Sequence, residues 1–303
     1  MEIARPAGLH ARFRFGEWAA QTIVSVNGIM AVMILLGIFV FLLKDGLPIL
    51  SYVSLWDFFF GAKWYPVSDP PTFGIMPFFV ATLMVTLVAI VIALPLGVGS
   101  AAFMAEVAPA ALRETLKPLI ELIAGVPSVV IGFMALILLA PAVKGVFHLN
   151  TGLCGLTAGI MLAFMSLPII VSISEDAMRA VPKEYKEASY ALGATRWQTI
   201  RHVIIPASLS GITAAVMLGV GRAIGETMTV LMVAGGALSI PTSPTEPMRP
   251  MTATIAAEIN NAVQGDLQYQ ALFAIGVVLF LLTFAVNLIA DIVLERQKRK
   301  FSR

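Results

Sequence analysis

Two ionisable residues, Arg222 and Glu226, lie within a long apolar run that begins near Val203 and continues past Val233. A charged side chain at the centre of a membrane span costs at least ~2.5 kcal/mol, so such residues usually face a protein interior or an aqueous path and mark the route of a polar solute. Their i,i+4 spacing predicts that both side chains share one helical face, although Arg before Glu is the weaker order. We interpret this segment as the substrate-handling element. The alternative is a buried ion pair that only fixes helix packing.

A second candidate position is Ser128, in the segment Gly125–Gly132. Pro127 predicts the start of a new helical half, which places Ser128 beside exposed backbone donors, and a helix N-terminus attracts anions. The alternative is a proline kink with an ordinary packed serine. Other hydroxyls in apolar runs are equally compatible with interhelical packing contacts, and these are Thr82, Thr86 and Thr227.

The composition identifies the class of protein that must position these residues. Of 303 residues, 58% are hydrophobic and 13% are charged, against ~25% charged in soluble domains. The chain is therefore expected to be an integral membrane protein. A formal charge of +2 argues against nucleic-acid binding. The single cysteine, Cys154, excludes an internal disulfide and a thiolate metal cluster, and no cofactor is expected.

The apolar runs predict six membrane spans, because one crossing needs about 20 apolar residues. The predicted spans are Trp18–Leu43, Pro70–Ala105, Pro118–Ala140, Leu153–Ser174, a long fifth run from Val203 to beyond Val233, and Leu267–Ala290. Pro77 and Pro95 predict kinks in the second span. Two longer loops, Lys44–Phe73 and Ala237–Asp266, join the first span to the second and the fifth span to the sixth. The fifth run exceeds the length of one crossing, so a tilted helix or a re-entrant end near Gly235 remains open.

The distribution of Lys and Arg predicts the orientation. Most of them lie in the two termini, in the turn from Glu106 to Lys117 and in the segment from Glu175 to His202, whereas the other loops hold Lys44, Lys63, Lys144 and Arg249. By the positive-inside rule both termini are expected in the cytoplasm, which requires an even number of spans.

The polar segment 175–202 contains the clearest pattern in the chain. Pro182 can open a short helix, Tyr185, Ala188 and Leu192 recur on one side, and Gly193 can end it. We expect an amphipathic helix that docks to a protein. The alternative is a helix on the lipid surface, which the interspersed acidic residues disfavour.

The motif Glu187-Ala-Ser-Tyr-Ala-Leu-Gly193, followed by nine residues and Val203-Ile-Ile-Pro206, resembles the cytoplasmic Glu-Ala-Ala loop of ABC importer permeases. Ser189 replaces the second Ala of that consensus. The resemblance implies an all-α type I permease fold with six transmembrane helices and a cytoplasmic coupling helix. It also implies that Glu187, Ala188 and Gly193 contact the cleft of an ATP-binding subunit.

Four further motifs are similar to those of phosphate-specific importer permeases of the C type, over about residues 74–287. They are Phe103-Met-Ala-Glu106, Gly125-Val-Pro-Ser-Val-Val130, Gly221-Arg-Ala-Ile-Gly-Glu-Thr-Met228 and Thr254-Ile-Ala-Ala-Glu258. Ile131 and Gly236 depart from this pattern, where relatives often have Tyr and Asn. The resemblance implies a substrate path that includes Arg222, Glu226, Thr227 and Ser128.

The resemblance also implies the partners, the location and the division of the chain. The partners are an ATPase subunit, a second homologous permease and an extracytoplasmic phosphate-binding protein, and the location is the bacterial cytoplasmic (inner) membrane. We divide the chain into residues 1–73, with the N-terminal tail, first span and outer loop; a permease core at 74–294; and a basic tail at 295–303.

Phosphate carries roughly −1.5 to −2 charges near neutral pH, and a planar Arg holds an oxyanion through two parallel hydrogen bonds. Glu226 could neutralise Arg222 between cycles or accept a hydrogen bond from a protonated phosphate. Other oxyanions, namely phosphonate, sulfate or molybdate, remain alternatives.

Other classes of protein lack their sequence signatures here. No Gly-x-x-x-x-Gly-Lys-Ser/Thr motif is present, so ATP would be hydrolysed by another chain and this subunit is not expected to be an enzyme. Neither His-Glu-x-x-His nor Gly-x-Ser-x-Gly is present. A proton-coupled carrier that uses Glu226 leaves the coupling motif unexplained, and a purely structural membrane subunit requires Arg222 and Glu226 to be silent.

Overall fold

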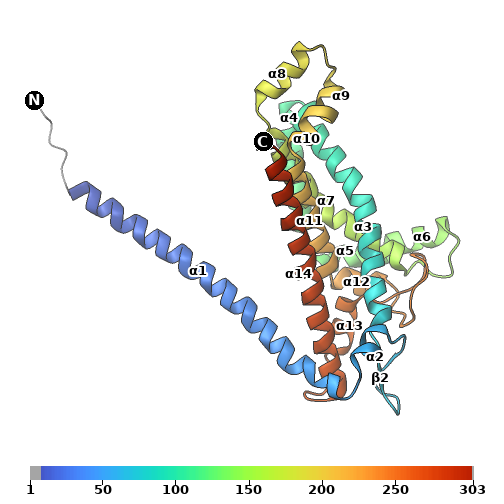
Figure 1. Cartoon of the computed structure of the whole chain (residues 1–303). Coiled ribbons are helices and arrows are strands. Elements are labelled where there is room, and N and C mark those ends of the chain that lie inside the picture. The colour runs from blue at the N-terminus through green and yellow to red at the C-terminus, as the bar shows by residue number, and fades with distance from the viewer. Residues whose placement is uncertain (1–7, 302–303) are drawn as a thin grey trace, which may run out of the picture.

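The computed structural model describes the backbone of residues 8–301 and the side-chain environments of Trp18 and residues 20–295. The fold is a bundle of long helices with one short hairpin of strands (Figure 1). Within the described residues, five segments are long and apolar enough to cross a membrane, and a sixth results if one bent helix pair counts as a single crossing. The predicted six-span, all-α architecture is consistent with this arrangement.

The centre of the bundle is α7 (Gly155–Arg179), which packs against α3 (Met76–Ala102) and α11 (Leu209–Gly225). Small residues dominate this contact, including Ala89 and Ala158. Small side chains allow helix axes to approach closely, which is how helices associate in lipid, where burial of apolar surface gives little driving force.

Helix α1 (Gly8–Gly46) leaves the bundle and contacts α14 (Leu267–Phe301) only near its C-terminal end (Figure 1). Phe39 stacks on Phe280 there, with ring centroids 4.7 Å apart. The predicted first span lies within α1. Helix α14 continues to Phe301, so the described part of the predicted basic tail is helical. The last two residues of that tail and residues 1–7 of the N-terminal tail lie outside the described part of the chain.

One end of the bundle, which we call the hairpin end, is more ordered than the predicted loop from Lys44 to Phe73. It contains a 3₁₀ turn η1 (Leu47–Ser51), α2 (Leu55–Phe60) and the antiparallel strands β1 (Trp64–Tyr65) and β2 (Thr72–Phe73). Trp64, Phe73 and Phe78 are buried together with their rings edge to face. Aromatic residues of this segment therefore form a small core of their own.

The third predicted span is displaced. Residues Ala110–Ala124 form a separate helix, α4, and the chain breaks at residues 125–127 before α5 (Ser128–Met134), the π-helical turn η3 (Ala135–Leu139) and α6 (Ala140–Val146). The apolar span therefore runs from Ser128 to Val146. The predicted start of the third span at Pro118 was wrong, because the charged residues between positions 113 and 121 make α4 amphipathic. Pro127 does begin a new helical half, as predicted.

The second span is α3, which continues into the π-helical turn η2 (Phe103–Val107). Pro95 lies inside α3, as predicted. Pro77 lies in its first turn, where the missing N–H has no intrahelical partner in any case. The kink predicted at Pro77 is therefore wrong.

The fifth segment is broken twice. It comprises α9 (Arg196–Thr199), the π-helical turn η4 (Ile200–Ile204) and α10 (Ile205–Ala207), followed after Ser208 by α11 and then by α12 (Met228–Val233). The axes change direction by 72° at Ser208, whose hydroxyl donates to the carbonyl of Ile204 at 2.7 Å. The chain then turns at Gly235 and Gly236, both with positive φ, and the loop that follows includes another helix, α13 (Met251–Glu258).

Candidate translocation and coupling sites

The break between α11 and α12 separates the two charged residues. Helix α11 ends at Gly225, and Glu226 has extended backbone angles of φ −70° and ψ 130°. No ion pair joins Arg222 to Glu226 in the described part of the chain. The prediction of two side chains on one continuous helical face was therefore wrong, since the i,i+4 rule applies only while the backbone stays helical.

Glu226 instead interacts with the start of α12. The backbone N–H of Thr229 donates to Glu226 Oε1 at 3.4 Å. A carboxylate is favourable beside the free N–H groups of a helix start. Its negative charge is thus partly stabilised by α12 rather than by Arg222.

Arg222 lies in the last turn of α11, and its side chain is half-buried. Its Nε is fully buried and has no hydrogen-bond partner among the described residues. A buried donor without a partner costs about 1–3 kcal/mol, and more when it is charged. Arg222 therefore retains hydrogen-bonding capacity that the described chain does not satisfy.

Threonine side chains hold the break in place. Thr252 Oγ1 donates to the carbonyl of Glu226 at 2.8 Å, and Thr229 Oγ1 donates to the carbonyl of Ser128 at 3.0 Å. The second contact brings the break at Glu226 against the break at Pro127. Sequence reasoning missed Thr229 and Thr252, although both are hydroxyl residues in largely apolar surroundings.

The predicted hydroxyl candidates have different environments. Ser128 is the first residue of α5 and is half-buried, while Thr227 precedes α12 and its Oγ1 donates to the carbonyl of Gly225 at 3.3 Å. Thr82 Oγ1 donates to Phe78 and accepts from the N–H of Met251 at 3.0 Å, so it is a packing contact. Thr86 Oγ1 is buried without a partner among the described residues.

The opposite end of the bundle, which we call the α8 end, carries α8 (Lys183–Ala191), and α8 projects from it together with α9 (Figure 1). Pro182 precedes the helix and Gly193, with φ +81°, follows it, as predicted. Glycine adopts this left-handed conformation without the steric cost that other residues carry. Glu187 and Ala188 are exposed, and Leu192 is 89% exposed.

The opposite face of α8 is anchored to the bundle. Ser189 is buried and its hydroxyl is hydrogen-bonded to that of Thr199 at 2.9 Å. Lys186 forms an ion pair with Glu106, and Arg196 donates to the carbonyl of the same residue. The exposed face is therefore presented from a fixed base.

A charged cluster lies beside this base. Lys117 of α4 contacts Glu175 at 2.7 Å and also pairs with Asp176, while Arg179 lies 3.4 Å from the other oxygen of Glu175. The Glu175 side chain is fully buried. Partial burial alone would lower the pKa of Lys117, but hydrogen bonds and charges from Asp176 and Glu175 outweigh it and raise this pKa above its ordinary value.

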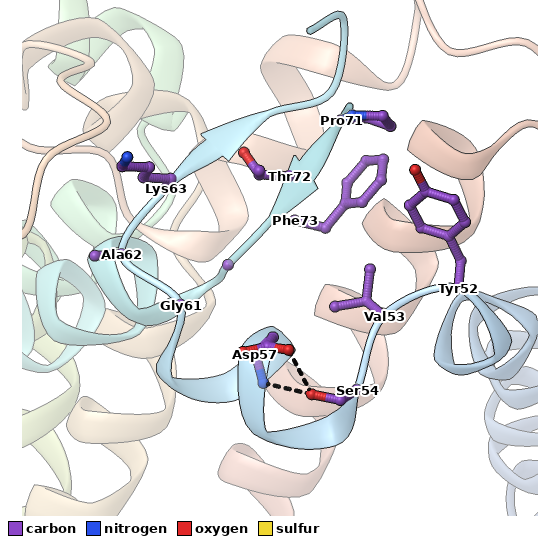
Figure 2. A pocket seen from close by; sticks show the side chains of 11 residues that line it. Tyr52, Val53, Ser54, Asp57, Gly61, Ala62, Lys63, Pro71, Thr72 and Phe73 are labelled. Carbon is purple, nitrogen blue, oxygen red and sulfur yellow. Dashed lines mark hydrogen bonds between the residues drawn. The ribbon is translucent and has the colours of Figure 1, made fainter. Parts of the chain in front are cut away.

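A large pocket of about 520 Å³ lies at the hairpin end, far in sequence from the break (Figure 2). Figure 2 shows Asp57 hydrogen-bonded to Ser54, which caps the start of α2. One oxygen of the Asp57 carboxylate thus accepts from Ser54, and Lys63 is the single cation among the described residues that line this pocket. Thr72 also lines it, and its Oγ1 is buried without a hydrogen-bond partner among the described residues.

These features define a multi-span membrane permease: broken spans meet near an arginine that has no ion-pair partner in the described part of the chain, and one end presents a short exposed helix. The chain belongs to the family described as "Binding-protein-dependent transport system inner membrane component", whose sequence profile matches residues 93–302. Such a permease is one component of an importer that also requires a binding protein and an ATPase.

Similar proteins of known sequence cover most of the chain. The "Probable ABC transporter permease protein YqgH" of Bacillus subtilis is 37% identical over 93% of this chain and 92% of the relative. The "Phosphate transport system permease protein PstC" of Mesorhizobium japonicum is 38% identical over 86% of this chain and 87% of its own. PstC of Pasteurella multocida is 34% identical, with 88% and 91% covered.

Solved structures share the fold. A chain of the bacterial alginate ABC transporter in complex with an alginate pentasaccharide-bound periplasmic protein has a TM-score of 0.65 over 94% of this chain and 96% of its own, at 13% identity. A chain of the inward-facing MetNI methionine ABC transporter has a TM-score of 0.59 over 76% and 99%, at 18% identity. Both confirm the predicted type I importer permease fold.

Proposed function

We propose that this chain is the permease subunit of an ATP-driven phosphate importer, that it forms half of the translocation pathway, and that Arg222 contacts the anion in transit. The observation that carries this proposal is the buried Nε of Arg222, which has no partner among the described residues at a break between two apolar helices. Relatives named as phosphate permeases, at 34–38% identity, support phosphate as the anion.

The chemistry of the break suits an anion that arrives and leaves. Arg222 is permanently charged and planar, so it can hold an oxyanion through two parallel hydrogen bonds. Because Glu226 is hydrogen-bonded at the start of α12, it leaves the guanidinium free for the anion. Ser128 and Thr227, at the edges of the two breaks, are the hydroxyl residues that we place along the same path.

We assign the α8 end to the cytoplasm. The C-terminal end of α14 and the first turns of α1 both lie toward that end (Figure 1), and the cation-rich segments 106–117 and 175–202 lie there too. The exposed face of α8, with Glu187, Ala188 and the Gly193 turn, then fits the ATPase subunit. The hairpin end faces the extracytoplasmic phosphate-binding protein. This chain lacks a nucleotide-binding motif, so the ATPase supplies the energy.

A second, homologous permease completes the pathway. Beside the break at Pro127, an apolar hollow of about 460 Å³ is lined by α5, η3 and α7 residues such as Met134, Leu138 and Phe164. The central break of this chain also supplies only Arg222 among the described residues, which is insufficient to neutralise a multiply charged anion. With the phosphate-binding protein supplied, we expect no phosphate uptake in liposomes that hold this chain and the ATPase but no second permease. Full uptake by such a homomeric complex would refute the pairing.

The test of the central site compares four variants in the reconstituted complex: Arg222→Lys, Arg222→Gln, Glu226→Gln and the double glutamine variant. Arg222→Lys keeps the charge but loses the planar fork, so we expect impaired uptake, and Arg222→Gln is expected to be nearly inactive. The double variant is expected to assemble normally and remain inactive. Phosphate uptake and the amount of assembled complex are measured side by side.

The matched control is Lys144→Gln, which removes an exposed cation outside the break and is expected to leave uptake unchanged. If Arg222 serves only packing, Arg222→Gln lowers the amount of assembled complex, and uptake per assembled complex stays normal. Near-normal uptake per complex by Arg222→Gln or by the double variant would sink the assignment of Arg222 to the path.

A further inference from the structure

A second arginine lies beyond the other end of α12. Arg249 follows Met248, whose N–H donates to the carbonyl of Ala234 at 2.7 Å and whose carbonyl accepts from the N–H of Gly236 at 3.0 Å. These bonds hold Arg249 beside the Gly235–Gly236 turn. A cavity of about 230 Å³ opens there, far above the volume that one water molecule needs. Arg249 is the only ionisable residue among the described residues that line this cavity.

One edge of the Arg249 guanidinium is occupied and the other is free. Nη1 donates to Glu258 at 2.8 Å, the single hydrogen bond of this side chain within the described chain. The Nε and Nη2 edge faces Gly236: a Cβ built on that glycine would lie 3.9 and 3.8 Å from these two atoms. Gly236 has φ +73° and no side chain, which leaves the space in front of this edge open.

Glu258 is itself fixed by other elements. Its Oε2 accepts from Trp64 Nε1 of β1 and from Gln268 Nε2 of α14, both at 3.0 Å. The indole of Trp64 is buried. Two donors therefore hold the carboxylate that holds Arg249, so the guanidinium is oriented before any ligand arrives. Such preorganisation reduces the entropy that binding costs.

The position of Arg249 relates it to the central break. Helix α12 has six residues, so at ~1.5 Å per residue the two arginines flank a helix roughly 9 Å long. Nε and Nη2 form the kind of two-donor edge that binds a carboxylate, sulfate or phosphate oxygen pair.

We propose that Arg249 is a second contact for the transported oxyanion, at the hairpin end of α12 and ahead of Arg222, and that Glu258 is its positioning residue. This inference rests on the proposed function, since it assigns the hairpin end to the side from which the anion enters. It adds a contact for the anion on the entry side, which Arg222 at the central break does not provide.

Charge rescue tests the proposal in the complete reconstituted importer. In a Cys154→Ala background, Arg249→Cys is expected to lower phosphate uptake at least 10-fold. Treatment with cationic aminoethyl methanethiosulfonate, which forms a disulfide with the introduced thiol and releases sulfinate, is expected to restore at least a third of the lost uptake. Neutral methyl methanethiosulfonate is expected to restore none. Lys144→Cys, treated identically, is the matched control and should transport normally throughout.

Arg249→Lys and Glu258→Gln separate contact from positioning. We expect Arg249→Lys to raise the half-saturating concentration of loaded binding protein several-fold, with less effect on the maximal rate. Glu258→Gln should give a smaller shift in the same direction, because the side chain still accepts a hydrogen bond. A purely structural bridge would instead lower the amount of assembled complex without changing the half-saturating concentration.

The proposal is overturned if Arg249→Cys transports normally or if the neutral reagent restores uptake as well as the cationic one. Its failure is distinguishable from that of the proposed function. If Arg222→Gln is inactive and Arg249→Cys is normal, the central site stands alone. If the wild type carries sulfate but not phosphate, the substrate assignment fails, and the same variants test Arg249 with sulfate.

Discussion

Charged residues are handled in opposite ways at the α8 end and at the break between α11 and α12. At the α8 end, the fully buried carboxylate of Glu175 is matched by Lys117 and Arg179 on neighbouring helices. At the break, Arg222 and Glu226 are only four residues apart, yet no ion pair joins them within the described chain. Proximity in sequence is therefore a poor guide to pairing.

The difference reflects what each region has to do. A paired buried charge resists rearrangement, because removing either partner leaves the other uncompensated. Such pairing suits a rigid region that holds α8 in place for contact with a partner. An unpaired arginine keeps its hydrogen-bonding capacity for a transient ligand. The comparison predicts that mutations at the α8 end change stability or assembly, whereas mutations at the break change transport.

The largest effect is expected at the Gly193 turn. Gly193→Asp should lower uptake at least 10-fold and release the ATPase during purification, while membrane insertion stays normal. Apart from its chain neighbours, no atom lies within 4 Å of a Cβ built at Gly193. Within the described chain, the positive φ is therefore the only obstacle to a side chain at this position. Asp tolerates a positive φ better than most residues. Loss of ATPase would therefore report a contact with the partner.

Gly265→Asp is the matched control, because Gly265 is also exposed, has a positive φ and has open space around it, but it precedes α14 instead of following α8. Wild-type ATPase stoichiometry and stimulated hydrolysis in the Asp variant would contradict the coupling role.

The next effect sharpens the contrast between paired and unpaired charges. Lys117→Met leaves Glu175 buried with only the longer contact to Arg179, and breaking a buried pair in this way costs about 3–5 kcal/mol. We expect the purified complex to unfold several degrees lower, as measured by thermal denaturation. Glu226→Gln should shift the midpoint much less, because no ion pair is lost. Equal shifts of the thermal midpoint in Lys117→Met and Glu226→Gln would contradict the distinction between paired and unpaired charges.

A smaller effect is expected where the two breaks meet. Thr229→Val removes the hydrogen bond to the carbonyl of Ser128 while keeping the shape of the side chain, and it should cost about 1 kcal/mol. Uptake is expected to fall a few-fold through misplacement of the break. Thr213→Val is the matched control, because it makes the same substitution in α11, away from the break between α11 and α12. An equal loss of uptake in Thr213→Val would argue against a specific role for Thr229.

The smallest effect is expected in the loop between α12 and α13. The N–H and hydroxyl of Thr242 donate to Glu246 and lower its pKa below the ordinary value of 4.5. A lowered pKa gives stability that is present above 4.5 and is lost as pH falls through the folded value. Hydrogen exchange at Thr242 should therefore be slower in wild type than in Glu246→Gln at pH 7. This difference should shrink as pH falls below 4.5 and the carboxylate becomes protonated, and a difference that stayed constant through that titration would contradict the ionic cause.

Features that depend on a short stretch of sequence were predictable. The apolar runs identified the membrane class and the approximate spans, because crossing a bilayer requires a minimum length of apolar residues wherever the other helices lie. Pro182 and Gly193 marked the ends of α8, and Pro127 marked the start of α5, because both residue types restrict or release the backbone locally. The motif around Glu187 indicated the family.

Only the tertiary structure decided which polar groups meet. The extended backbone at Glu226 receives a hydrogen bond from Thr252, 26 residues further on, and no helical periodicity contains that information. The burial of Glu175 depends on Lys117, 58 residues earlier. The Arg249–Glu258 pair depends on Trp64, 194 residues before Glu258. Hydrophobic length is a local property of the chain, whereas the pairing of buried charges is a property of the packed bundle.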